Sequence, residues 1–307
     1  MSQSKRFLTL LFAALLVLQP AEARKKAFTV FIGDYPATSG WSKIHAANDK
    51  SIVLATLQNN GFLASDIICL EESYATYRAI SESLQSFVKS CQSGDQIYIH
   101  FSCHGQWITD VNGDERLRNP RDKYDESIIP YDAQVAFNWG GLGYKGENHL
   151  IDDEIERYLL DIENKIGRNG CLLIVIDACH SGDAHRLSSD EHSEEGSYLC
   201  RGSKNAFDLP YKGGGSPRSH AADTDCIIIT ACHDFESNYE CTVDGVQYGR
   251  LSYAISKVWK PGMDQESLRD AIEEEYCFLS IISPLPEERT QRPTFVLSKK
   301  YTGRKLF

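Results

Sequence analysis

Short apolar runs alternate with amphipathic segments along most of this chain, and this alternation constrains the fold more than any other feature of the sequence. The unbroken apolar run from Cys171 to Ile176 is typical of a strand that is buried on both faces of a sheet. Strands that alternate with helices predict parallel strands joined by helical crossovers. We therefore expect an α/β fold with a mainly parallel sheet of about six strands, flanked by helices on both faces. Strands are expected at 27–32, 67–70, 95–102, 171–176, 226–230 and 294–297, and helices at 48–59, 76–91, 152–166, 251–259 and 266–278.

Two stretches interrupt this alternation. The segment 188–225 is rich in Ser, Gly, Asp and Lys and has no hydrophobic period, which predicts a long flexible loop. The insertion 108–149 carries turn signals and is expected to be surface loop with a short hairpin. Neither stretch resembles a linker between independent units, so residues 24–307 are expected to form one domain.

The N-terminus has the pattern of a secretory signal peptide. Lys5 and Arg6 precede an apolar run from Phe7 to Leu18, and the small-x-small sequence at 21–23 fits a signal peptidase site. The run is shorter than the roughly 20 residues that span a bilayer, although an uncleaved anchor helix remains the alternative. We expect residues 1–23 to be removed and the mature protein to be exported, to a periplasm or out of the cell, with no integral membrane span.

The charge balance argues against some partners. Lys and Arg number 32 against 43 Asp and Glu, a net charge of -11, so a broad surface for nucleic acid has no electrostatic support. The ten cysteines lack the dense, regular spacing of a disulfide scaffold, so we expect several of them to be small buried hydrophobes.

Reactive side chains follow two of the predicted strands. Cys103-His104-Gly105 comes directly after the strand that ends at Ser102, and the sequence from Asp177 to Gly182, DACHSG, follows the buried run. Ligands of parallel sheets bind at the carboxyl ends of the strands. A thiol there becomes a nucleophile when a nearby imidazole takes its proton, and backbone amides beside it can stabilise an oxyanion.

These residues resemble the metacaspase branch of the caspase-like cysteine peptidases, which is marked by an HG dipeptide and a D-x-C-H-S-G sequence. The resemblance extends from about residue 28 to the C-terminus, with weaker matches in between at 47–49, 125–132 and 150–154. It implies that Cys179 is the nucleophile and His104 the general base. It also implies that the amides of Gly105 and Cys179 hold the oxyanion, and that the chemistry requires no cofactor.

The same resemblance implies a pocket for a basic residue. Asp177 and Asp49 match the two acidic residues that form its floor in the family, so the expected substrates are peptides and proteins cut after Arg or Lys. Two structural alternatives stay open, since Asp49 could be a helix cap and Asp177 could stabilise a turn. Glu236 and Tyr239 follow a later strand and could contact substrate.

The sequence departs from the family at Cys103, where a glycine is usual. This creates a second Cys-His pair, with Cys103 as nucleophile and His180 as base, and it allows a Cys103–Cys179 disulfide that would silence the enzyme. A structural zinc site is a further alternative. Its ligands would come from His100, Cys103, His104, Cys179, His180 and His185.

Calcium and self-processing complete the expectations. The resemblance implies that Asp132, Asp152 and Asp153 bind calcium, although Asp152 and Asp153 could instead cap the helix that follows them. Basic residues in the loop 188–225 are candidate sites of self-cleavage. The competing function is a catalytically silent module that binds basic peptides, and the sequence does not indicate an oligomeric state. The basic residues of the loop are Arg201, Lys204, Lys212 and Arg218, among others.

Overall fold

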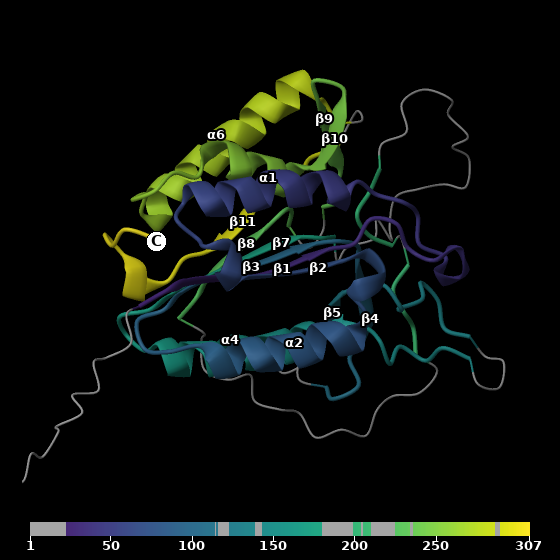
Figure 1. Cartoon of the computed structure of the whole chain (residues 1–307). Helices are drawn as coiled ribbons and strands as arrows, with labels where there is room; N and C mark the ends of the chain where they lie inside the picture. The colour runs from purple at the N-terminus through teal and green to yellow at the C-terminus, as the bar shows by residue number, and fades with distance from the viewer. Residues whose placement is uncertain are drawn as a thin grey trace, which may run out of the picture.

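A six-stranded sheet forms the centre of the molecule and confirms the predicted α/β class (Figure 1). The computed structural model describes residues 23–113, 115, 123–138, 143–179, 199–203, 205–209, 225–233, 236–285 and 289–307. The predicted signal peptide therefore lies, apart from its last residue, outside the described residues. The strand order is β11-β8-β7-β3-β1-β2, and all neighbours are parallel except β11, which runs antiparallel to β8. These strands are β1 (Lys25–Phe31), β2 (Ile67–Glu71), β3 (Gln96–Ser102), β7 (Cys171–Asp177), β8 (Ile227–Thr230) and β11 (Thr294–Val296).

Helices cover both faces of this sheet, as predicted. In Figure 1, α1, α5 and α6 lie above the sheet, and α2 and α4 lie below it. Thr76 caps α2, because its side chain accepts a hydrogen bond from the Ala79 amide. The helices are α1 (Ala46–Asn59), α2 (Tyr77–Ser90), α4 (Asp152–Ile166), α5 (Arg250–Val258) and α6 (Gln265–Ile282). Short 3-10 helices lie at Ala37–Ser39, Ala64–Asp66, Glu72–Tyr74 and Lys299–Tyr301.

The side chains of the central strands divide between two hydrophobic clusters. On β7, Leu172 and Ile174 pack with the residues of α2 and α4, whereas Leu173 and Val175 pack with those of α1, α5 and α6. Full burial of each such side chain contributes about 1.5–3 kcal/mol. Because side chains alternate along a strand, Asp177 shares a face with Leu173 and Val175. The fold thus directs this carboxylate towards α1 and α5.

Two small sheets were only partly expected. The insertion 108–149 contains a hairpin of β4 (Gly105–Thr109) and β5 (Tyr124–Ile128), extended by β6 (Leu150–Ile151). A second hairpin, β9 (Glu240–Val243) and β10 (Val246–Gly249), was not predicted. Its turn is the pair Asp244-Gly245, and both residues have positive φ, as a two-residue hairpin turn requires.

The predicted loop 188–225 is described only in part. Residues 199–203 and 205–209 belong to it, and these are not free in solvent, which corrects the expectation of a flexible loop for this part of the segment. Isolated β-bridges pair the backbone of Cys200 with Tyr239, that of Gly202 with Gly105, and that of Phe207 with Ile108. The backbone polar groups of these residues find partners along the edge of β4 and beside β9, and this explains their order.

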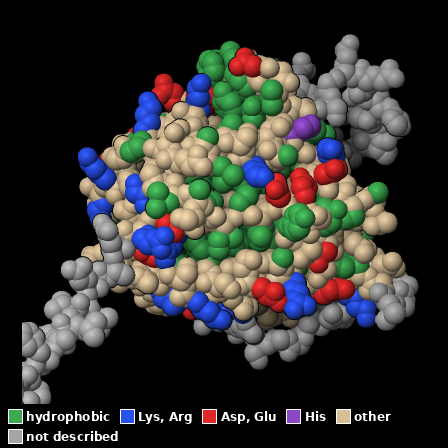
Figure 2. All heavy atoms as spheres, in the orientation of Figure 1, with side chains coloured by type: hydrophobic (Ala, Val, Ile, Leu, Met, Phe, Trp, Pro, Cys, Tyr) green, Lys and Arg blue, Asp and Glu red, His purple; other side chains and the backbone are tan. Residues whose placement is uncertain are grey.

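The surface agrees with the charge of the sequence. Figure 2 shows acidic and basic side chains interspersed over the face it presents, with hydrophobic side chains between them. No helix among the described residues has the length and apolar composition that crossing a bilayer demands.

Candidate active site

The predicted catalytic residues follow two neighbouring strands. Strands β3 and β7 are paired so that Ser102 lies beside Asp177 at their carboxyl ends. His104 and Gly105 come directly after β3, and Cys179 comes directly after β7. The parallel register therefore brings both loops to the same edge of the sheet, as the sequence predicted.

His104 is held as a neutral imidazole whose Nδ1 is available. The side chain is fully buried and stacks on Trp41, with 4.9 Å between ring centroids. Nε2 donates a hydrogen bond to the Ser42 carbonyl oxygen at 2.8 Å. Because a carbonyl can only accept, Nε2 carries the proton and Nδ1 keeps its lone pair. Nδ1 is buried and has no hydrogen-bond partner among the described residues, so it is placed to accept a proton.

Burial sets the pKa of His104. Burial in this aromatic site lowers the pKa to about 4, although the hydrogen bond to Ser42 raises it. Negative charge on Cys179 also raises this pKa, which shows that the two side chains interact electrostatically. At neutral pH, His104 is therefore unprotonated.

Cys179 lies among other thiols. Its Sγ is fully buried and donates a weak hydrogen bond to the Glu236 carbonyl oxygen at 3.6 Å. Contact with Cys179 is the first cause of the raised pKa of Cys200 and of Cys232, ahead of burial. None of the ten cysteines, all of which are among the described residues, is paired in a disulfide. The thiols next to Cys179 are thus Cys200 and Cys232. The sequence had instead suggested Cys103 as its partner in a disulfide.

Cys103 has the properties of a core residue. Its side chain is fully buried, and burial raises the pKa of the thiol to about 12. A thiol with so high a pKa is a poor nucleophile at neutral pH. His180, its predicted partner in the alternative pair, lies outside the described residues.

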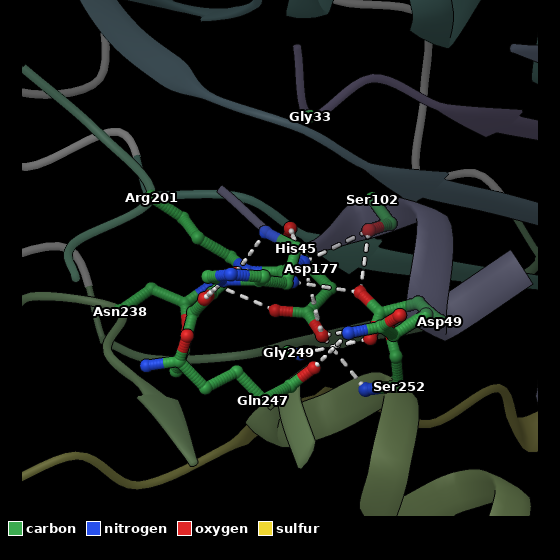
Figure 3. A network of polar contacts seen from close by, with 12 residues as sticks. Gly33, His45, Asp49, Ser102, Asp177, Arg201, Asn238, Gln247, Gly249 and Ser252 are labelled. Atoms are coloured by element: carbon green, nitrogen blue, oxygen red, sulfur yellow. Dashed lines mark hydrogen bonds and ion pairs between the residues drawn. The ribbon is translucent and has the colours of Figure 1, made fainter. Parts of the chain in front are cut away.

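The two predicted pocket residues lie together, and a basic side chain of the same chain fills the space between them (Figure 3). Arg201 has no exposed surface. Its Nη2 lies 2.7 Å from Asp49 Oδ2, and its Nη1 lies 3.7 Å from Asp177 Oδ2. Asp49 comes from α1 and Asp177 from the end of β7, so these elements form opposite walls of the site.

A third carboxylate completes this site. Glu240, the first residue of β9, accepts hydrogen bonds from Arg201 Nε at 3.2 Å and Nη2 at 2.8 Å through the same oxygen. Its other oxygen lies 2.6 Å from His45 Nδ1. We call Asp49, Asp177 and Glu240 the acidic pocket. Three buried carboxylates need a positive charge beside them, and the Arg201 guanidinium supplies it.

Neighbouring polar groups fix the carboxylates. Ser252, near the N-terminus of α5, donates from both its amide and its hydroxyl to Asp177 Oδ2, each at 2.7 Å. Asn238 donates to Asp177 Oδ1 at 2.8 Å, and the Gly249 amide donates to Asp49 Oδ1 at 2.9 Å. These donors hold the anions in place before any substrate enters. Ser102 also joins the network, donating to Asp49 and accepting from Arg201 Nη1.

The pocket carboxylates differ in acidity. Burial raises the pKa of Asp49 to about 6, against the opposing effect of Arg201. Burial also favours a higher pKa for Asp177, but Arg201 and the hydrogen bonds from Asn238 and Ser252 outweigh it, so this pKa is lowered. Asp49 is therefore the pocket carboxylate that protonates first as the pH falls.

The expected oxyanion donors both point at one atom. The Cys179 amide donates to the Arg201 carbonyl oxygen at 2.9 Å, and the Gly105 amide donates to the same oxygen at 3.1 Å. Two amides that converge on one carbonyl oxygen, beside a thiol, form the arrangement that stabilises a tetrahedral oxyanion.

The predicted calcium ligands have separate partners. Asp132 accepts from the Tyr77 amide at 2.8 Å, and Asp153 accepts from Asn112 at 2.8 Å. Asp152 has a buried Oδ1 that finds no hydrogen-bond partner among the described residues, and burial together with the carboxylates around it raises its pKa. Across the described residues, no group of three or more His, Cys, Asp or Glu side chains is arranged to hold a metal ion. Calcium binding stays a prediction.

The zinc alternative gains no support from His100. Its Nδ1 lies 2.8 Å from the Tyr98 hydroxyl and its Nε2 lies 3.1 Å from Ser252 Oγ, so both ring nitrogens are engaged in hydrogen bonds. Burial lowers the pKa of His100 to about 4. These contacts make His100 part of the support behind the acidic pocket.

Three contributors to the site were not assigned from the sequence. Arg201 was one of several basic residues in a loop, and no local pattern distinguished it. Glu240 starts a hairpin whose Asp-Gly turn could have been recognised, and this would have placed its side chain at the sheet edge. Ser42 acts through its backbone carbonyl, which every residue type possesses, so no sequence signal marks it.

Known proteins resemble this chain in sequence. Residues 46–188 match the family model of the metacaspase, peptidase C14 domain. The chain is 28% identical to metacaspase-3 of Arabidopsis thaliana over 251 residues, which cover 78% of this chain and 61% of that protein. It is 32% identical to metacaspase-1A of Aspergillus terreus over 133 residues, which cover 41% of this chain and 28% of that protein. The chain thus spans between 28% and 61% of the length of these two relatives.

Solved structures share the fold. Caspase-1 of Spodoptera frugiperda superposes with a TM-score of 0.55 at 12% identity, covering 90% of this chain and 89% of that one. A protein of Geobacter sulfurreducens gives a TM-score of 0.56 at 18% identity, covering 89% and 92%. The motif after β7, the match to the metacaspase domain and the caspase-like sheet agree with one another. Residues 46–188 thus resemble the metacaspase, peptidase C14 domain, and the fold of the described residues resembles that of a caspase.

Proposed function

We propose that this protein is a cysteine endopeptidase that cuts peptide bonds after basic residues, with Cys179 as nucleophile and His104 as general base. One observation carries the proposal. Arg201 sits with its guanidinium in the acidic pocket while its carbonyl oxygen accepts hydrogen bonds from the amides of Cys179 and Gly105. A substrate residue at a scissile bond must satisfy both conditions at once.

The chemistry follows from the positions of these groups. His104 Nδ1 takes the proton of the Cys179 thiol, and the thiolate attacks the carbonyl carbon of the residue in the pocket. The amides of Cys179 and Gly105 stabilise the oxyanion, and His104 returns the proton to the leaving amine. Water then hydrolyses the thioester. The Ser42 carbonyl keeps the imidazole in the tautomer that this sequence of proton transfers needs.

The pocket favours arginine over lysine. Arg201 contacts Asp49, Ser102 and Glu240 at the same time through different guanidinium nitrogens. The single ammonium group of a lysine cannot reach partners in such separate directions. A lysine side chain would therefore leave some of these acceptors unpaired. An aspartate at this position would meet three carboxylates and be repelled.

Export and calcium activation belong to the same proposal. The basic n-region, apolar run and small-residue site at 1–23 support removal of a signal peptide. The buried Asp152 oxygen, which has no partner within the described part of the chain and lies beside other carboxylates, supports a requirement for a cation. The N-terminus of the protein recovered after expression tests export, and activity measured with calcium and with chelator tests activation.

The test of the proposed function is hydrolysis of fluorogenic peptides that end in Arg, Lys or Asp. The parent chain is compared under reducing conditions with two variants. Cys179→Ala removes the proposed nucleophile, and Cys277→Ala removes an exposed thiol from α6 as a control. We expect cleavage after Arg, weaker cleavage after Lys, and a loss of at least about 1,000-fold for Cys179→Ala alone. If Cys179→Ala stays active, Cys179 is not the nucleophile and the proposed mechanism is wrong. If no peptide is cut, a module that binds basic peptides becomes the favoured function.

A further inference from the structure

Trp41 packs its indole against the imidazole of His104. The two rings stack with 4.9 Å between their centroids and an angle of 25° between their planes. His104 has no exposed surface, and Trp41 is only 8% exposed. An aromatic ring stacked this closely keeps water away from that face of the imidazole. The proposed chemistry gives this tryptophan no task, although it touches the general base.

The hydrogen bonding of His104 does not by itself fix the plane of the ring. Rotation of an imidazole about its Cβ–Cγ bond has broad energy minima, so the surrounding contacts have to select the angle. Nε2 donates to the Ser42 carbonyl oxygen, which holds one corner of the ring. A stacked indole restricts the tilt of the whole ring. Trp41 thereby controls the direction in which the Nδ1 lone pair points.

Tyr35 holds the backbone of the same histidine. Its hydroxyl accepts a hydrogen bond from the His104 amide at 3.2 Å and donates one to the Ile129 carbonyl oxygen at 2.8 Å. Its ring centroid lies 5.3 Å from that of His104 and 6.1 Å from that of Trp41. Tyr35 therefore fixes the position from which the imidazole projects, and the angle of the imidazole is left to Trp41.

The turn that carries Trp41 is itself anchored. The Trp41 amide donates to Ser39 Oγ at 3.3 Å, and the Ser39 carbonyl oxygen accepts from the Val135 amide at 2.9 Å. Gly40 has a φ of 82°, in the left-handed region that favours glycine, and a Cβ atom there would lie 2.6 Å from Val135 Cγ1. Because Ser42 directly follows Trp41, one anchored turn supplies both the ring and the carbonyl that hold the general base.

We propose that Trp41 is a positioning residue of the peptidase, whose indole keeps the His104 ring at the angle that directs Nδ1 to the Cys179 thiol. This inference rests on the proposed function, in which His104 takes the thiol proton. Loss of the indole should slow the chemical step. It should leave binding of the basic side chain unchanged, because the acidic pocket is built from α1, β7 and β9 and has hydrogen-bond donors of its own.

The experiment compares two replacements of Trp41 by hydrolysis of a fluorogenic Arg peptide. Trp41→Leu keeps apolar bulk without an aromatic face, and it should lower kcat by about 10-fold to 100-fold with KM within about 2-fold of the parent. Trp41→Phe keeps an aromatic face and should recover most of the loss. Trp41 Nε1 is buried and has no hydrogen-bond partner among the described residues, so phenylalanine gives up no bond to that part of the chain.

A matched control removes a different stacked indole. Trp107 of β4 stacks on Tyr124 of β5 with 6.0 Å between ring centroids. Trp107→Leu makes the same chemical change as Trp41→Leu and should leave kcat unchanged. If Trp41→Leu does not fold, Trp41→Met provides a flexible apolar replacement of similar length.

A second measurement is independent of activity. In the Cys179→Ala background, the ¹⁵N NMR shifts of the His104 ring report which nitrogen carries the proton. We expect a single tautomer, protonated at Nε2, both with Trp41 and in Trp41→Phe. Trp41→Leu should give a mixture of tautomers, because a ring that changes its tilt weakens the hydrogen bond to the Ser42 carbonyl oxygen.

The outcomes separate the two proposals. If the parent cuts Arg peptides through Cys179 while folded Trp41→Leu keeps the parental kcat, or changes only KM, the proposed function stands and this inference is wrong. A folded Trp41→Phe that is as slow as Trp41→Leu, or an unchanged tautomer in Trp41→Leu, would also contradict it. If the parent cuts no Arg peptide, the proposed function itself fails, and the role of Trp41 fails with it.

Discussion

Three carboxylates and one guanidinium form a buried charge cluster in which each residue has a distinct task. Asp177 is fixed by four hydrogen bonds or ion pairs, to Asn238, to Ser252 twice and to Arg201. Asp49 has a pKa of about 6 and is the member that changes charge near neutrality. Glu240 binds two nitrogens of the guanidinium. Recognition of the basic side chain therefore depends on pH through Asp49 and on geometry through Glu240.

The first prediction concerns pH. As the pH falls through the pKa of Asp49, at about 6, this carboxylate is neutralised and the hold on Arg201 weakens. His104, with its pKa lowered to about 4, is still unprotonated there. The kcat/KM for Arg peptides should therefore fall on the acid side with a midpoint near the pKa of Asp49, measured by hydrolysis of a fluorogenic Arg peptide across pH. The Asp49→Asn variant should be slower and should lack this limb, whereas a parental midpoint at the pKa of His104 would contradict the assignment.

The second prediction isolates the third carboxylate. Glu240→Gln keeps the shape of the side chain but removes a buried partner of the guanidinium, which should cost about 1–3 kcal/mol of binding, or roughly 5-fold to 150-fold in kcat/KM for Arg peptides. Asp244→Asn removes the same charge from the exposed turn of the same hairpin and should change little. Equal effects of the two variants would show that only net charge matters.

At the scale of elements, the site is an assembly of strand ends closed by one hairpin. Strands β3 and β7 bring His104 and Cys179 together, and α1 contributes Asp49. The hairpin of β9 and β10 then supplies Glu240 at its first residue and Gly249 at its last, where α5 begins. The hairpin thus forms one wall of the acidic pocket and joins it to the helix whose N-terminus faces Asp177.

The third prediction tests this junction. A Cβ atom on Gly249 would lie 2.2 Å from Asp177 Oδ2 and 2.5 Å from Arg201 Nη1, so the glycine leaves the space that a guanidinium occupies. Its φ of -60° is one that alanine adopts without strain. Gly249→Ala should therefore fill the pocket and reduce kcat/KM for Arg peptides by at least about 100-fold. The effect should appear mainly as a higher KM, because the bound substrate and the transition state lose the same contacts with the pocket. A parental KM in a folded Gly249→Ala protein would contradict this account.

At the scale of the whole molecule, the segment 199–203 contributes to stability through the ion pairs of Arg201. Arg201 neutralises carboxylates that lie in the middle of the fold between α1, β7 and β9. Removing one partner of a buried ion pair costs about 3–5 kcal/mol, because it leaves the remaining charges without compensation. The uncut chain should therefore be more stable with Arg201 than without it.

The fourth prediction measures this contribution in the Cys179→Ala background, where no cut occurs. Arg201→Ala should lower the free energy of unfolding by about 3–5 kcal/mol at neutral pH, measured by urea denaturation. Arg201 lowers the pKa of Asp49, so without it this carboxyl protonates more readily and the loss should shrink as the pH falls. Lys212→Ala, in the same loop, serves as the control. A loss that grows on acidification would mean that the pocket charges are not its cause.

The sequence by itself determined the layered α/β architecture, because hydrophobic periodicity reports which faces are buried and does not depend on distant contacts. It also predicted that His104 and Cys179 lie together, since each follows an apolar strand and parallel strands end at a common edge, while the resemblance to metacaspases implied their roles. The hairpin 240–249 was within reach, because Asp244-Gly245 is a recognisable turn signal.

Only the tertiary structure decided which residue fills the acidic pocket and which atoms hold it. Arg201 is separated from Asp49 by 152 positions and from Glu240 by 39, and nothing local distinguishes it from the other basic residues of its loop. The Ser42 carbonyl and the amides of Gly105 and Cys179 are backbone groups that every sequence carries. Their function arises from where the chain places them, and the physical reason is that charge compensation and hydrogen bonding act between groups brought together in space, whatever their separation along the chain.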